Sequence, residues 1–374
     1  MRRLRSRAQE ARLKRVQASP RFAGGQFHNT APVDQGLKKG THLSTTREFV
    51  FGRQRRVPKA TFPLVDPREP WQRPTQSGLR VTWLGHSTTL VEIDGFRVLT
   101  DPVWGERASP VAFAGPKRFH PAPVSIEQLP QLDAIVISHD HYDHLDRPSI
   151  TRLLALGVPF VTSLGVGAHL EAWGVPAERI FELDWWESIE LRGLTITAAP
   201  AQHFSGRGLG DRNATSWSSF VLCGPRHTVF FSGDTGLTEE YREIRERFGS
   251  FDLIMLEVGA WDPAWDDIHL GPANALHAHA MLGGGAFLPV HWGTFNLGLH
   301  AWNEPAEDLL KLRPSDAPLI MPRLGQPVEP RHVELIDPWW REVEETGTAP
   351  SPVRAPHRQG EPAPVRGGDH RLRR

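Results

Sequence analysis

Ile135-Val-Ile-Ser-His-Asp-His-Tyr-Asp-His-Leu-Asp146 is the stretch that decides the fold. An apolar run rich in β-branched residues leads directly into a cluster of histidines and aspartates. The run from Leu132 to Ser138 has no polar alternation, which is typical of a buried strand that is covered on both faces. The sequence therefore places the polar cluster in a loop at the end of such a strand.

The side chains of this loop are metal-ligand types, because zinc accepts imidazole nitrogens and carboxylate oxygens. A loop can turn its side chains inward together, whereas a continuing strand would send them alternately to opposite faces. A loop of solvated histidines is the alternative interpretation. Further ligand candidates at the ends of later predicted strands argue against it. All the metal-ligand candidates are His139, His141, Asp143, His144, His203, Asp234 and His291.

His139-Asp-His-Tyr-Asp-His144 resembles the HxHxDH signature of the metallo-β-lactamase superfamily. The resemblance implies an α/β fold, the αββα sandwich, in which two mixed sheets pack face to face with helices outside. The predicted order of elements agrees, since strands and helices recur in two similar halves. The resemblance further implies two Zn²⁺ ions per chain. One would be held by His139, His141 and His203, the other by Asp143, His144 and His291, with Asp234 as the bridge.

Two divalent ions about 3.5–4 Å apart lower the pKa of bound water and polarise the bond that it attacks, so the implied reaction is hydrolysis. Asp143 is therefore a catalytic candidate as well as a ligand. His269, in Ile268-His-Leu-Gly-Pro272, is the second catalytic candidate, since it could bind a substrate phosphate or protonate a leaving oxygen. A surface histidine beside a helix start is the alternative. His86 follows a predicted strand, Leu79–Leu84, and could equally support the ligands or be an ordinary loop residue.

From Leu79 to Leu312 the chain also resembles the N-acyl-phosphatidylethanolamine-hydrolysing phospholipase D family. The matching segments are Val81-Thr-Trp-Leu-Gly-His86, Leu99-Thr-Asp-Pro102, Arg107-Ala-Ser-Pro110, Gly115-Pro-Lys-Arg-Phe119, Glu182-Leu-Asp-Trp-Trp-Glu187, Arg247-Phe-Gly249 and His291-Trp-Gly-Thr-Phe295. This resemblance implies a phosphodiesterase that acts on a lipid or another small phosphodiester with an apolar arm. Arg107, Lys117 and Arg118 are cations suited to an anionic head group. The alternative is that they hold their loop against acidic neighbours such as Glu106.

Other functions are compatible with the same motif. Bacterial ascorbate-6-phosphate lactonases resemble this branch of the fold, and a fold does not choose between a carbonyl and a phosphorus ester. A non-catalytic, zinc-stabilised binding module is a second alternative. A nuclease is disfavoured because 43 basic residues balance 43 acidic ones, which leaves no overall field to gather nucleic acid.

Composition restricts the setting of the protein. The single cysteine, Cys223, excludes an intrachain disulfide framework and a Cys-rich zinc finger. An apolar run long enough to span a membrane, or a secretory signal, is not visible. We therefore expect a cytoplasmic protein, compatible with peripheral contact to a membrane and with homodimerisation.

The 374 residues divide into four segments. Residues 1–21 are predicted to be a basic mobile arm, since positions 1–20 hold seven Arg or Lys against one Glu, and attraction to anionic lipid is its functional interpretation. Residues 22–78 are an extended lead-in over the core. Residues 79–345 are the hydrolase domain, and residues 346–374, rich in Pro, Gly and Arg, are a disordered tail.

Overall fold

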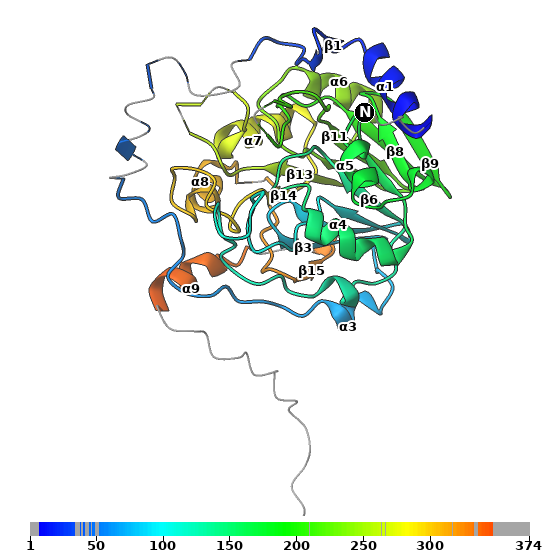
Figure 1. Cartoon of the computed structure of the whole chain (residues 1–374). Helices are drawn as coiled ribbons and strands as arrows, with labels where there is room; N and C mark the ends of the chain where they lie inside the picture. Colours follow the sequence, from blue (N-terminus) through cyan, green and yellow to red (C-terminus); the bar gives the residue numbers. More distant parts are fainter. Residues whose placement is uncertain are drawn as a thin grey trace, which may run out of the picture.

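The computed structural model describes residues 7–33, 38, 40–41, 45, 47–48, 52–208, 210–262, 264–265, 267–315, 317–332 and 336–346. Within these ranges two large sheets stack face to face, and helices cover their outer faces (Figure 1). The αββα sandwich predicted from the sequence is therefore confirmed.

The seven-stranded sheet has the spatial order β15 (Pro327–Val328), β3 (Leu79–Gly85), β4 (Thr88–Ile93), β5 (Phe96–Thr100), β6 (Ala134–Ile137), β7 (Phe160–Ser163) and β8 (Ile180–Leu183). The six-stranded sheet has the order β14 (Ala286–Val290), β13 (Leu253–Glu257), β12 (Thr228–Phe231), β11 (Ser219–Cys223), β10 (Leu194–Ala199) and β9 (Ser188–Leu191). A small hairpin of β1 (Phe22–Ala23) and β2 (Gln26–Phe27) precedes them.

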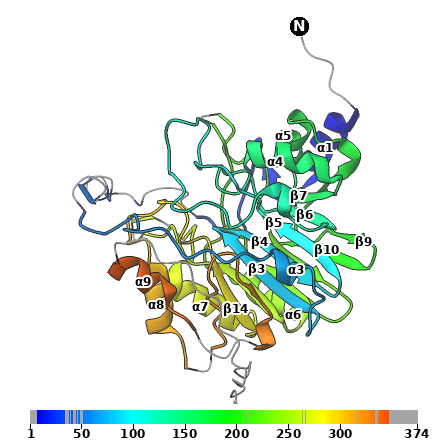
Figure 2. The ribbon, with the colours of Figure 1, turned by 90° about the horizontal axis from the view of Figure 1, so that it is seen from below.

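The helices lie on both sides of the sandwich. Figure 2 shows α4 (Arg147–Leu153) and α5 (Gly167–Ala172) on one side, and α6 (Glu240–Phe248), α7 (Gly271–Met281) and α8 (Glu304–Leu312) on the other. The remaining α-helices with described bounds are α1 (Arg7–Ala18), α3 (Arg68–Trp71) and α9 (Trp339–Thr346). Short 3₁₀ turns occur at Ile126–Gln128, Leu154–Leu156, Ala177–Arg179 and Pro330–His332.

Strand β6 is covered on both faces, as its apolar sequence predicts. Ala134 and Val136 belong to the core between the two sheets, whereas Ile135 and Ile137 pack in a second cluster with helical residues such as Ile150. Successive side chains of a strand point to opposite faces, so an uninterrupted apolar run is what this position requires. Parallel neighbours β5 and β7 enclose the strand, and the histidines and aspartates of the motif follow at its carboxyl end.

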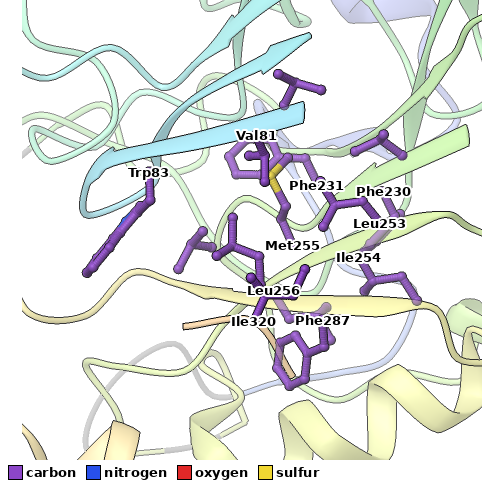
Figure 3. Packing of buried hydrophobic residues seen from close by; sticks show 14 of the residues in the cluster. Val81, Trp83, Phe230, Phe231, Leu253, Ile254, Met255, Leu256, Phe287 and Ile320 are labelled. Carbon is purple, nitrogen blue, oxygen red and sulfur yellow. The ribbon is translucent and has the colours of Figure 1, made fainter. Parts of the chain in front are cut away.

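The core between the sheets is built from large side chains of both. Figure 3 shows Phe231 and Met255 from the six-stranded sheet opposite Val81 from β3. The register pairs Phe231 with Met255, and β12, β13 and β14 all run parallel. The core therefore holds the carboxyl ends of these three strands at one edge of the sandwich.

The amino-terminal segment differs from the mobile arm that we expected. Residues 7–18 form α1, whose Val16 is buried and whose Arg12 contacts Glu171 and Glu182 at 2.9 and 2.5 Å. Arg15 donates to the backbone carbonyl of Glu182 at 2.5 Å. These acidic partners lie more than 150 residues further along the chain, so local composition could not indicate the docking. Residues 1–6 and 347–374 lie outside the described residues, and the disordered tail stays a prediction.

Described residues of the segment 22–78 pack against the sandwich. Phe27, Phe62 and Trp71 are buried, and Val65 donates its backbone N–H to Leu324. Among the described residues, no helix is both long and apolar enough to cross a bilayer.

Phe230 offers a test of this packing. The change Phe230→Ala should lower the free energy of unfolding by about 3–5 kcal/mol, because it opens a cavity under α6, where Phe230 packs against Tyr241 and Phe251. Leu312→Ala is the control, since Leu312 is 49% exposed at the end of α8. Urea unfolding of the metal-free proteins measures both values. A loss below about 1 kcal/mol for Phe230→Ala would contradict the described core.

Candidate metal centre

The ends of several strands converge on one cluster. Strands β10 and β12 are both antiparallel to β11, and β14 is parallel to β12 through β13. The chain leaving these strands carries His203, Asp234 and His291, while the loop after β6 carries His139 to His144. All seven predicted ligand candidates are therefore brought together at one edge of the sandwich.

The first group consists of His139, His141, His203 and Asp234, whose ligand atoms lie within 4.8 Å of one another. His139 Nε2 lies 2.8 Å from His141 Nδ1, and His203 Nε2 lies 3.3 Å from the same nitrogen. Asp234 Oδ2 is 3.8 Å from His139 Nε2 and 3.7 Å from His203 Nε2. Three imidazoles and one carboxylate thus point at a common position.

The second group consists of Asp143, His144, His291 and His86. Asp143 Oδ2 lies 3.2 Å from His291 Nε2 and 3.4 Å from His144 Nε2. Asp234 reaches this group as well, because its Oδ1 is 3.0 Å from His144 Nε2 and its Oδ2 is 3.1 Å from His291 Nε2. Asp234 therefore lies between the two groups.

The donor set fits divalent cations. His144 Nε2 and Asp234 Oδ1 are buried without a hydrogen-bond partner among the described residues, although they face each other at 3.0 Å. Buried polar atoms of this kind are rare in native proteins, and a bound ion satisfies them. Nitrogen-rich and carboxylate ligands suit zinc. These residues could hold two ions that share Asp234.

Buried carboxylates make the centre favourable for positive charge. Burial by itself would lower the pKa of His144. The carboxylates of Asp234, Asp143 and Asp101 outweigh it and raise that pKa well above its usual value. By contrast, burial lowers the pKa of His139 well below its usual value, so this imidazole stays neutral. Neutral imidazole is the form that binds a metal.

Asp101 orients two of the ligand candidates, although in the sequence it was noted only as part of the matching segment Leu99-Thr-Asp-Pro102. Its Oδ2 lies 2.7 Å from His144 Nδ1 and accepts a hydrogen bond from Ser138 Oγ at 2.6 Å. Ser138 Oγ also lies 2.9 Å from His139 Nδ1. Such partners fix ring orientation and tautomer in metal sites. A carboxylate at the end of β5, beside the motif strand β6, is the signal that could have indicated it.

His86 lies against the ligand candidates and is not a solvated loop residue. Its side chain is buried, and its Nε2 is 2.9 Å from Asp143 Oδ2. Trp83 Nε1 donates to the backbone carbonyl of His86 at 2.8 Å, and Thr294 Oγ1 accepts its backbone N–H at 2.7 Å. The supporting role, one of the two that the sequence left open, is therefore the one that the geometry favours.

His269 lies beside the ligand candidates, in contact with a residue that the sequence analysis did not single out. Its Nδ1 is 2.7 Å from Oε2 of Glu257, which is fully buried at the end of β13. The rings of His269 and His203 have centroids 5.1 Å apart. Burial raises the pKa of Glu257. The sequence signal that could have indicated Glu257 is an acidic residue at the end of a buried strand.

The lead-in contributes Asn29, which the sequence analysis also missed. Asn29 Oδ1 accepts the backbone N–H of His203 at 3.0 Å, and Asn29 Nδ2 donates to the carbonyl of His203 at 2.8 Å. Trp217 Nε1 donates to Asn29 Oδ1 at 3.1 Å. Both backbone groups of one ligand candidate are thus held by a side chain from outside the predicted hydrolase domain.

The contacts of the three cations in the loop before β6 distinguish between the two interpretations given above. Arg118 is buried, and its guanidinium donates to the carbonyls of Val103 and Gly105. Lys117 Nζ lies 2.8 Å from Glu106. Arg107 donates to Gly115 at 2.6 Å. These contacts hold the loop, as the alternative interpretation proposed, and Arg118 Nη1 alone is a buried donor without a hydrogen-bond partner among the described residues in this loop.

Asn29→Ala tests the clamp on His203. The change removes both hydrogen bonds to the His203 backbone, so the affinity for Zn²⁺ should fall about tenfold. Asn303→Ala is the matched control, because Asn303 makes no side-chain cap bond at the start of α8. Competition with a chromogenic chelator measures the affinity. Equal affinities for the two variants would exclude the clamp.

Comparisons with known proteins agree with this geometry. Residues 96–292 match the family described as Beta-lactamase superfamily domain. An uncharacterised protein of Mycobacterium tuberculosis is 46% identical over 329 residues, which cover 86% of this chain and 88% of that protein. N-acyl-phosphatidylethanolamine-hydrolyzing phospholipase D 1 of Caenorhabditis elegans is 39% identical over 249 residues, 63% of this chain and 70% of that protein.

Solved structures share the fold. The isothiocyanate hydrolase from Delia radicum gut bacteria aligns with a TM-score of 0.55 at 24% identity, over 67% of this chain and 98% of that one. With the converging ligand groups, these similarities show that the chain belongs to the metallo-β-lactamase superfamily, as a metal-dependent hydrolase that resembles the N-acyl-phosphatidylethanolamine-hydrolysing phospholipases D.

Proposed function

We propose that the chain is a binuclear zinc phosphodiesterase of the phospholipase D type, acting on lipids like N-acyl phosphatidylethanolamine. The observation that carries the proposal is the two ligand groups joined by Asp234, in a chain similar to the nematode phospholipase D. In this assignment His139, His141 and His203 hold one ion and Asp143, His144 and His291 hold the other. Zinc bound there would supply Lewis acidity and a water of lowered pKa.

The protein side chains orient the ligands and move protons. Asp101 and Ser138 hold the rings of His144 and His139 from behind. Glu257 lies against Nδ1 of His269, which leaves Nε2 as the nitrogen that can serve the leaving oxygen. Burial lowers the pKa of His269, but Glu257 and Asp234 outweigh it and raise that pKa, which favours the protonated form that a general acid requires.

The choice of a phosphodiester rests on the phospholipase relative and on positive charge near the centre. Arg118 is buried with Nη1 unpartnered, and its guanidinium lies 5.2 Å from the ring centre of Phe295. Phe295 in turn packs edge-on against His86. A fixed guanidinium donor suits an anionic phosphate oxygen better than a neutral lactone carbonyl.

Two variants separate ligation from proton transfer. Asp234→Asn disturbs both ions, so bound zinc should fall and kcat should drop by more than about 1,000-fold. His269→Ala should keep the zinc and lower kcat by roughly 100-fold. Metal analysis beside steady-state kinetics gives both readouts. Full zinc occupancy and a normal rate in Asp234→Asn would remove the assignment, as would activity that survives in metal-free protein.

The substrate is tested with a panel. Zinc-loaded protein is assayed on N-acyl phosphatidylethanolamine, a short-chain phosphodiester and several lactones, with Asp143→Asn as background. We expect kcat/KM on a diester to exceed that on any lactone. The reverse preference by more than about tenfold, equivalent to about 1.4 kcal/mol, would establish the lactonase alternative instead.

A further inference from the structure

The loop between β5 and β6 presents six consecutive exposed residues without a charge or a polar side chain. We call this segment, Pro110-Val-Ala-Phe-Ala-Gly115, the apolar tip. Phe113 is 83% exposed, the highest value among the exposed large hydrophobic side chains of the described residues, and Val111 is 38% exposed. Single exposed apolar residues are ordinary, but an uninterrupted exposed apolar run indicates a binding surface.

The base of the loop holds the apolar tip in place. Arg107 and Lys117 form an antiparallel bridge, and Arg118 donates its backbone N–H to Glu106 at 2.8 Å. Arg107 Nη1 donates to the carbonyl of Gly115 at 2.6 Å. The apolar residues are therefore presented on a bonded support.

The charges beside the apolar tip are mainly positive. Lys117 and Glu106 neutralise each other in an exposed pair. Arg107 and the exposed Arg147, at the start of α4, line the same cavity and add two positive charges. Apolar residues next to cations match the boundary between acyl chains and anionic head groups.

The apolar tip is also next to the metal centre. The cavity behind it has a volume of about 560 Å³, and its lining joins Val111 and Ala112 to Tyr142. Tyr142 stands between the ligand candidates His141 and Asp143 in the chain. A surface that received the apolar tip would therefore lie against the side of the molecule where the metal-binding loop begins.

We propose that the apolar tip inserts into the surface of an anionic lipid bilayer, with Phe113 as the anchor and Arg107 and Arg147 over the head groups. The choice of a lipid as occupant rests on the proposed phospholipase function, while the binding itself is measurable without catalysis. In the basic helix α1, Arg12 and Arg15 are engaged by acidic side chains of the body.

Co-sedimentation with vesicles tests the proposal. The full-length, zinc-loaded protein is mixed with vesicles of phosphatidylcholine, with or without phosphatidylglycerol. We expect binding to the anionic vesicles that Phe113→Ser weakens about tenfold, since a phenyl side chain no longer leaves water. Leu312→Ser is the matched control, because it removes an apolar side chain that is 49% exposed and lies on a different element, α8. Arg147→Gln should weaken binding to anionic vesicles only, in a salt-dependent way.

The outcomes separate this proposal from the enzyme assignment. Phe113→Ser should hydrolyse a water-soluble diester at the wild-type rate but lose rate on vesicles. Equal vesicle binding by Phe113→Ser and Leu312→Ser, or absence of binding by the wild type, would overturn the proposal. A shift from dimer to monomer in sedimentation velocity on Phe113→Ser, with vesicle binding unchanged, would show a contact between copies instead. Vesicle binding without diester hydrolysis would contradict the proposed function alone.

Discussion

Buried negative charge at Asp234 is the constraint on which the centre depends. Its two oxygens face His144 and His291, and Oδ1 has no hydrogen-bond partner among the described residues. A buried carboxylate is costly unless cations or several donors surround it. Asp234 is surrounded in this way only because strand ends from both sheets converge on it. The chemistry of the site therefore depends on the stacking of the two sheets. The rest of the fold serves to hold this edge.

Much of the fold was predictable because its pattern is local. The apolar run before His139 indicated a strand covered on both faces. Asp-Gly pairs are typical of tight hairpins, and Asp94-Gly95 joins the antiparallel strands β4 and β5. Both residues of that turn have positive φ, 49° and 92°. Strand β9 and helix α5 were not predicted, since the half-exposed alternation of Ser188–Leu191 is weak and α5 has only six residues.

The candidate site, like the fold, was predictable only in part. Ligand candidates were visible because histidine and aspartate followed apolar strands. Asp101 and Glu257 left only the weaker signal of an acid at the end of a strand, and Asn29 left none, since its partner His203 lies 174 positions away in the chain. The docking of α1 through Arg12 was not predictable either, because its partner Glu182 is distant in the chain. Periodicity reports which face of an element is buried, but it does not report which distant side chain will meet it.

The clamp between Asn29 and His203 has a consequence for the order of folding. The two residues are 174 positions apart, and the ion pair of Arg12 with Glu182 spans 170. Contacts across so long a loop carry a large closure entropy and form slowly. The sheets can assemble from nearer pairings, such as the hairpin of β3 and β4. Docking of the amino-terminal segment is therefore expected among the last steps, and the His203 side of the centre matures after the core.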